Sequence, residues 1–240
     1  MGVSTSIART RRVTRSGRTC ENQIKREGLV STGKIEEDMV KYYTPKETLF
    51  LPTGYNFNMP PIHPHDGDDG KTGLLGEGRL PKYHPRVETL GVLDETSAAL
   101  GLARSLCKDP QTEGLLKTVQ RDLYKIMSEV AASPENARRF HTLDPERIQW
   151  LESQADAITA RVHAPVEFTL PGDTLPGAAI ALARTIARRA ERRVAEMLDT
   201  GEIENRVLLQ YLNRLSSLCF ALELHENAQA GKPTSLAKEK

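Results

Sequence analysis

The stretch ARTIARRAERR at residues 183–193 decides the fold, because it combines five arginines with the periodicity of a buried helix. At 3.6 residues per turn, one face carries Arg184, Arg188 and Arg192, with Glu191 beside them. The apolar side of the same helix is predicted to be Leu182, Ile186, Ala190 and Val194. Arginines four residues apart repel each other. The stripe therefore predicts carboxylates, a polyphosphate or a nucleic acid as partner; the alternative is a solvated face with nearby glutamates.

Four further segments show helical periodicity, with apolar residues recurring three and four positions apart. They cover residues 88–106, 111–132, 144–162 and 204–230. Asp144 followed by Pro145 predicts a helix start, and Gly201 is expected to end the arginine-rich helix. No segment alternates long enough to predict a sheet. We therefore expect an all-α protein, a five-helix up-and-down bundle of the ferritin-like kind.

The composition is that of an ordinary soluble protein, with 240 residues, 38% hydrophobic and 27% charged, and a formal net charge of +1. A domain that binds nucleic acid is usually basic overall, so the balanced charge argues against that partner. Cys20, Cys107 and Cys219 are widely spaced and odd in number, which favours a reducing compartment over a secretory one. No apolar run is long enough to span a bilayer, so no membrane partner is expected.

Residues 1–65 lack a sustained hydrophobic period and are predicted to form a poorly ordered extension. Residues 1–20 carry arginines among serines and threonines and no acidic residue, which is the composition of a mitochondrial transit peptide. If this segment is instead a basic tail or a wrongly extended start, the expected location is the cytoplasm. The helical-bundle domain is predicted over residues 66–230, and a flexible tail over residues 231–240.

Residues 67–78 form a glycine-rich loop whose backbone N–H groups can approach a ligand closely. Its GKT run resembles the end of a P-loop, but His65 stands where that motif needs glycine, and no apolar strand precedes it. A calcium loop is excluded because glycine and lysine occupy a ligand position and the invariant glycine position. His63 and His65 lie beside prolines and are expected to face solvent, so no metal site is predicted. Taken alone, the loop could be a flexible linker.

Six motifs follow one another along the chain as one ordered series. They are GDDGKT at 67–72, RLPK at 79–82, GVLDE at 91–95, FTLPG at 168–172, RRAER at 188–192 and LNRLS at 212–216. This series resembles the family of ATP:cob(I)alamin adenosyltransferases of the propanediol-utilisation type, over residues from about 67 to 230.

The resemblance implies a five-helix bundle that acts as a homotrimer, with ATP and the corrinoid bound at each interface between subunits. Such an enzyme transfers the 5′-deoxyadenosyl group of ATP to the cobalt of cob(I)alamin and releases triphosphate, with Mg²⁺ bound to the nucleotide. The product is adenosylcobalamin. The partners implied are a flavin-type reductase and an adenosylcobalamin-dependent mutase or dehydratase.

The resemblance also assigns an ATP site. It comprises Pro64, His65, Asp66, Gly67, Asp68, Gly70, Thr72, Gly73, Lys82, Arg188, Arg189, Glu191, Arg192 and Asn213. The loop residues and the lysine would hold the triphosphate and its magnesium. The arginines would bind phosphate oxygens across the interface, Glu191 would orient them, and Asn213 would hold the nucleoside.

Three residues receive catalytic roles from the same resemblance. Asp94 would pair with Arg184 of the neighbouring subunit, and Phe168 would close the corrin face and displace the lower ligand of cobalt. Cob(I)alamin is itself the nucleophile, so the chain needs no side-chain base or covalent nucleophile.

The chain departs from the family pattern at residues 64–66, where Pro-His-Asp replaces two hydroxyls and a cation. Asp66 repels polyphosphate unless it binds magnesium, and Lys71 could compensate part of that charge. Ala181 and Ser217 stand where many members have histidine and aspartate. The alternatives are a weakened or non-catalytic corrinoid-binding or delivery protein of the same fold, a wrongly joined N-terminal segment, and a nucleic-acid-binding bundle.

Overall fold

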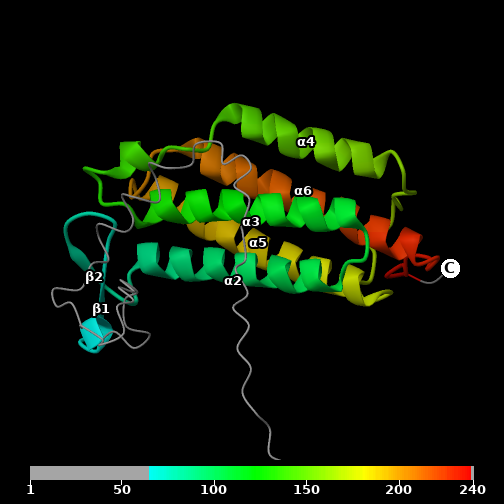
Figure 1. Cartoon of the computed structure of the whole chain (residues 1–240), viewed down its shortest axis with the longest axis horizontal. Helices are drawn as coiled ribbons and strands as arrows, with labels where there is room; N and C mark the ends of the chain where they lie inside the picture. Colours follow the sequence, from blue (N-terminus) through cyan, green and yellow to red (C-terminus); the bar gives the residue numbers. More distant parts are fainter. Residues whose placement is uncertain (1–64, 239–240) are drawn as a thin grey trace, which may run out of the picture.

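The computed structural model describes residues 65–238, and within them five long helices form a bundle (Figure 1). They are α2 (Pro85–Leu106), α3 (Pro110–Ala131), α4 (Pro145–Thr159), α5 (Leu175–Asp199) and α6 (Arg206–Gln229). The prediction of five helices is confirmed. No helix among the described residues is long and apolar enough to cross a membrane. The predicted N-terminal extension and transit peptide, with His63 and Pro64, lie outside the described residues.

Each helix begins at a residue whose side chain accepts a hydrogen bond from a backbone N–H group of the first turn. These N-caps are His84, Asp109, Asp144, Thr174 and Asn205. A proline follows in the first turn of α2, α3, α4 and α5, where its missing N–H costs nothing. Gly201 follows α5 at φ +74°, a conformation that glycine adopts without strain. The helix boundaries are therefore set by neighbouring residues, as predicted for Asp144 and Gly201.

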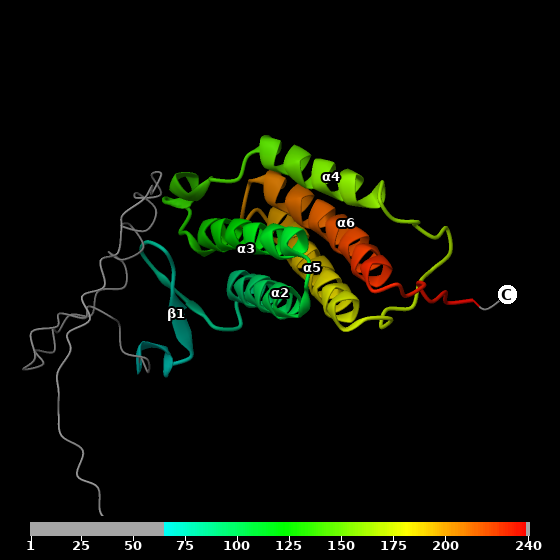
Figure 2. The same cartoon turned by 45° about the vertical axis from the view of Figure 1, so that its right-hand side comes forward.

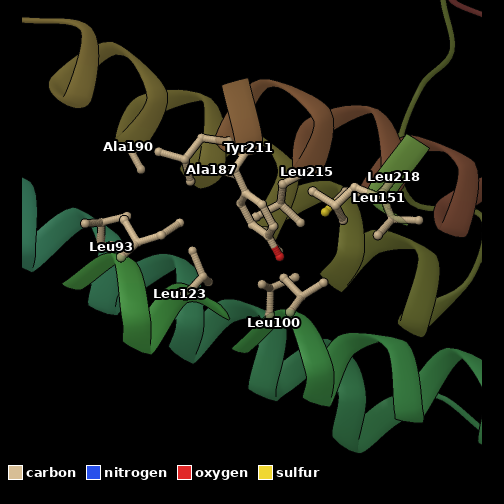
Figure 3. Packing of buried hydrophobic residues seen from close by; sticks show 14 of the residues in the cluster. Leu93, Leu100, Leu123, Leu151, Ala187, Ala190, Tyr211, Leu215 and Leu218 are labelled. Carbon is tan, nitrogen blue, oxygen red and sulfur yellow. The ribbon is translucent and has the colours of Figure 1, made fainter. Parts of the chain in front are cut away.

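The core lies where α5 packs between α2 and α6, with α3 and α4 completing it. Figure 3 shows leucines of α2 and α3 facing alanines of α5 and the ring of Tyr211. The Tyr211 hydroxyl donates to Asp122 Oδ2 at 2.8 Å, and Arg147 Nε donates to the same oxygen at 2.6 Å. Tyr211 therefore packs in the bundle interior and satisfies its polar end there.

The apolar side of α5 differs from the prediction by about one residue in rotation. Leu182 was assigned to it but is 52% exposed, and Ile186 is half-buried. The buried stripe instead runs through Ala183, Ala187, Ala190, Val194 and Met197. Small alanines let the α5 backbone approach both neighbouring helices closely, which decides the rotation against the larger side chains.

A short antiparallel hairpin precedes the bundle, and no strand pattern predicted it. It consists of β1 (Lys71–Gly73) and β2 (Arg79–Pro81), paired in register Thr72 to Leu80. Between the strands, Leu75 makes two backbone hydrogen bonds with the end of α3, to Ala131 at 2.8 Å and from Ser133 at 3.1 Å. Figure 2 shows the hairpin beside the N-terminal end of α2, outside the helices.

The C-terminal segment pairs with the connection between α4 and α5. Leu170 N donates to Ser235 O at 2.8 Å, and Ala237 N donates to Phe168 O at 2.7 Å. Asp173 accepts hydrogen bonds from the backbone N–H and the hydroxyl of Ser235, at 3.0 and 2.6 Å. Residues 235–237, within the range that the sequence predicts as a flexible tail, therefore form hydrogen bonds with the segment before α5.

Candidate functional site

The glycine-rich loop wraps an open depression of about 620 Å³ beside the start of α2. Its lining comprises Asp69, Gly70, Lys71, Pro81, Lys82, Tyr83 and Glu88. The chain turns at Gly70, where φ is +78°, and Lys82 N donates to Gly70 O at 2.9 Å. A Cβ at Gly67 would lie 2.8 Å from Lys82 Nζ, so the lysine side chain lies close against the backbone of Gly67. The loop thus places two lysines around a concave surface.

The remaining predicted loop residues surround this turn. His65, Asp66 and Gly67 form a short 3₁₀ helix, and Thr72 and Gly73 lie in β1. His65 Nδ1 lies 3.4 Å from Asp68 Oδ2, and both side chains are exposed. No group of three metal-ligating side chains occurs among residues 65–238.

Arg79 holds the loop together, although the sequence did not single it out. Its guanidinium forms a bidentate pair with Asp69, at 2.7 and 2.8 Å. It also donates to the backbone oxygens of Lys71, at 3.2 Å, and of Asp66. This pairing lowers the pKa of the Asp69 carboxyl below its usual value. The sequence signal that could have indicated this pairing is the acidic run at residues 66–69, followed ten positions later by an arginine.

The arginines of α5 divide into two sets. Arg189 pairs with Glu95 of α2, and Arg193 lies 3.7 Å from Glu88 and 3.0 Å from Glu196. These contacts place carboxylates against two of the five arginines, as the solvated-face alternative expects. Arg188 and Arg192 are exposed and make no hydrogen bond or ion pair with any residue between 65 and 238. They are the arginines left available for an anion.

Glu88 connects the arginine helix to the glycine loop. Its side chain lines the depression, and one of its carboxylate oxygens lies 3.7 Å from Arg193. The C-terminal half of α5 and the two loop lysines therefore lie at the same end of the bundle. This arrangement brings cations from three separate sequence motifs toward one region.

Asn213 belongs to a chain of hydrogen bonds that crosses three helices. Its Nδ2 donates to Glu191 Oε1 at 2.7 Å, and its Oδ1 accepts from Arg214 at 2.8 Å. Arg214 Nε in turn donates to Glu152 Oε1 of α4 at 2.6 Å. Glu191 is therefore oriented by Asn213 within this chain. Glu152, 62 residues away from Arg214, was missed because no local pattern reports such pairing.

Arg184 and Asp94 do not pair within one chain. Asp94 is exposed on α2. Arg184 is half-buried, and its buried Nε has no hydrogen-bond partner among the described residues. Glu223 lies near it with an equally unpartnered buried oxygen, and burial raises the pKa of the Glu223 carboxyl while Arg184 opposes that shift. An unpaired buried N–H of a cation is costly, so this site needs a further partner.

Phe168 is 89% exposed on the connection between α4 and α5. Val166 and Leu170 on the same segment are also exposed, so three apolar side chains project from it. The pairs Glu95–Arg189 and Glu88–Arg193 show that α2 and α5 run antiparallel. Phe168, just before α5, thus lies near the far end of α2 from the glycine loop. The 22 residues of α2 separate the two by ~33 Å.

Comparison with known proteins gives a consistent result. A family model described as cobalamin adenosyltransferase matches residues 62–226. The corrinoid adenosyltransferase PduO of Citrobacter freundii is 38% identical over 74% of this chain, and that of Salmonella typhimurium is 37% identical over 70%. The chain spans about half the length of these two relatives, 53% and 50%. The corrinoid adenosyltransferase of Bacillus subtilis is 39% identical over 71% of this chain and 88% of its own length.

A solved structure shows the same fold. It is a variant of a PduO-type ATP:corrinoid adenosyltransferase from Lactobacillus reuteri, complexed with cobalamin and ATP. The two chains superpose with a TM-score of 0.70 at 31% identity, over 75% of this chain and 100% of that one.

Proposed function

Because the chain belongs to the cobalamin adenosyltransferase family, we propose that it transfers the 5′-deoxyadenosyl group of ATP to the cobalt of a reduced corrinoid. Cobalt(I) attacks carbon 5′ and supplies the electron pair of the new bond. The C5′–O bond breaks, its electron pair leaves with the triphosphate, and the cobalt becomes cobalt(III). The chain then has to position two substrates and stabilise a leaving group, without a protein nucleophile.

The observation that carries this proposal is the pair of uncompensated arginines on the half of α5 that lies toward the lysine-lined loop. Arg188 and Arg192 are exposed and unpaired within residues 65–238, whereas the neighbouring arginines already have carboxylates. Guanidinium and ammonium groups stabilise the negative charge that grows on a leaving triphosphate. Lys71 and Lys82 line the depression at the same end of the bundle. A polyphosphate is the ligand that this set of charges fits.

Magnesium fits the same loop. Asp66 and Asp68 are exposed carboxylates at its start, and such oxygens, together with phosphate oxygens, are the ligands that Mg²⁺ prefers. When bound, the ion supplies further neutralisation of the triphosphate charge. This role also gives a use to Asp66, which would otherwise repel the nucleotide.

The separation of Phe168 and the glycine loop supports a site shared between subunits. A single chain holds them ~33 Å apart, so one copy cannot place both on one substrate pair. Leu102 and Leu182, each 52% exposed, lie two turns along α2 and α5 from the pair Glu95–Arg189. This strip is the surface we assign to a second copy, and the homotrimer is the assembly we propose. The guanidinium of Arg184, which is half-buried in one subunit, would then meet Asp94 of the next.

Phe168 is proposed to close over the corrin ring. An apolar side chain at the lower face excludes the axial ligand, and removing that ligand makes cobalt easier to reduce. A flavin-type reductase as electron donor and an adenosylcobalamin-dependent mutase or dehydratase as acceptor complete the proposal. Mitochondrial import rests on the composition of residues 1–20 alone.

The decisive experiment mixes the purified chain anaerobically with ATP, Mg²⁺ and chemically reduced cob(I)alamin, and follows absorbance. Formation of a light-sensitive product is expected. Corrinoid binding without product or triphosphate release would instead support the delivery protein considered above.

Two variants then test the site. In Arg188→Ala, kcat/KM for ATP should fall about a hundredfold or more, because a leaving-group contact is lost. Arg121→Ala, an exposed arginine of α3 outside the arginine stripe, is the matched control and should leave turnover and subunit mass unchanged. Equal turnover in both variants would refute the role of the arginine helix.

A further inference from the structure

The glycine-rich loop makes few contacts that would hold its conformation. It lies outside the helical core, and its strands, Lys71–Gly73 and Arg79–Pro81, are three residues each. Apart from this pairing, Leu75 is its main attachment to the bundle. A two-stranded hairpin of this size is unstable on its own in water. Other interactions must therefore define the loop before a ligand arrives.

Arg79 supplies them from a single side chain. Its guanidinium binds both carboxylate oxygens of Asp69 and the backbone oxygens of Asp66 and Lys71. The backbone N–H of Lys71 adds a hydrogen bond to Asp69 Oδ1 at 3.1 Å. These bonds tie the start of the loop, the residue before the Gly70 turn and the first residue of β1 to β2. Bidentate arginine–carboxylate geometry fixes direction as well as distance.

The charges explain why this pair is needed beside a polyphosphate. Asp69 lines the depression together with Lys71 and Lys82, and a free carboxylate there would repel phosphate oxygens. Arg79 faces that carboxylate and neutralises it. Nη1 and Nη2 of Arg79 both donate to the loop, so the guanidinium acts on the ligand through the loop's shape.

We propose that Arg79 and Asp69 form a positioning clasp that presets the loop of residues 66–71 to receive the triphosphate of ATP. Arg79 is a positioning residue and does not itself touch phosphate. This inference rests on the proposed function, since it assigns the loop to the nucleotide of that same reaction.

The test is a double-mutant cycle on the full chain, using Arg79→Ala, Asp69→Ala and the two together. Arg79→Ala should raise KM for ATP about ten- to a hundredfold, because a misplaced loop misplaces its ligand. kcat at saturating ATP and KM for the corrinoid should change less than about twofold, since bound ATP restores the shape of the loop and with it the position of Lys71. Arg79→Lys should recover only part of the affinity, because lysine cannot bind both carboxylate oxygens.

The cycle separates a clasp from a direct phosphate contact. If Arg79 acts through Asp69, the double variant is no worse than Arg79→Ala alone. Additive losses would show that Arg79 contacts phosphate, and would overturn the proposal. An unchanged KM for ATP in Arg79→Ala would overturn it equally. Arg121→Ala is again the control, and circular dichroism melts should coincide for all variants because the hairpin lies outside the core.

A second measurement keeps this test independent of turnover. Inorganic triphosphate with Mg²⁺ is titrated calorimetrically into the wild-type chain and into Arg79→Ala. Weaker binding to the variant supports the clasp even if no adenosylated corrinoid forms, in which case only the proposed function fails. Equal binding to both proteins, or no binding to either, overturns the clasp.

Discussion

Tyr211→Phe tests whether the tyrosine next to Asn213 belongs to the core or to the nucleotide pocket. The side chain is fully buried, and its hydroxyl donates to Asp122 Oδ2 at 2.8 Å. A hydrogen bond to a charged group contributes about 1.5–3 kcal/mol. Asp122 keeps Arg147 at 2.6 Å, so its carboxylate is not left unpaired. We therefore expect a loss of about 2 kcal/mol, near the lower end of that range.

That loss should lower Tm by about 4–8 °C, given about 2–4 °C per kcal/mol for a domain of this size. The assay is thermal unfolding followed by circular dichroism at one fixed protein concentration, because subunit association also contributes to stability. Burial holds the pKa of Tyr211 well above its usual value, so the hydroxyl remains a donor throughout the pH range of such an assay. Tyr83→Phe, at an exposed ring, is the control and should leave Tm unchanged.

Activity provides the second half of the test. Because Tyr211 points into the interior, KM for ATP should be the same in Tyr211→Phe and in the wild-type chain. A variant with normal Tm and a raised KM would refute the core assignment and place the hydroxyl on the nucleotide. A combined Tyr211→Phe and Asp122→Asn variant should lose less than the sum of the single losses, since both remove the same bond.

Three further changes have defined outcomes. Glu223→Gln should raise Tm at pH 8 but not near pH 5. Because burial raises the folded-state pKa of Glu223, the wild-type chain loses stability as pH rises through that pKa, and glutamine removes this loss. Equal Tm shifts at both pH values would contradict the argument. Leu182→Glu should reduce the mass seen by light scattering without loss of helix, because it places charge in the proposed subunit interface; an unchanged mass would rule that strip out. Phe168→Ala should slow product formation from cob(II)alamin with a reductant, while KM for ATP stays constant; unaltered rates would remove Phe168 from the corrin site.

The sequence predicted what is set locally. Asp144 with Pro145 and Gly201 lie where α4 begins and α5 ends, because caps depend on a few neighbouring atoms. The helices themselves follow from apolar residues three and four apart. The rotation of α5 could not be read in the same way, since a stripe of alanines and the stripe that includes Leu182 are both helical patterns. Close packing against α2 and α6 chose the alanines.

The features of the site that the sequence did not predict are contacts between distant segments and very short strands. The hairpin strands have three residues each, too few for an alternating pattern to be recognised. Glu152 meets Arg214 only because α4 packs on α6. Motif order predicted that Glu191 and Asn213 would share a site, and their hydrogen bond at 2.7 Å shows that they are adjacent within one chain.

The arginines of α5 differ in their partners because they point in different directions around the helix axis. Residues 188 and 189 are neighbours in sequence, but a step of 100° turns Arg189 toward Glu95 of α2 and leaves Arg188 without a partner among the described residues. The same difference recurs one turn later: Arg193 pairs with Glu88 and Glu196, whereas Arg192 has no partner among the described residues. Two of the five arginines thus help to join α2 to α5, and two remain for an anion. Since the two free arginines lie four apart, their mutual repulsion is relieved only when that anion binds, so the affinity for a polyphosphate includes the relief of strain within the free helix.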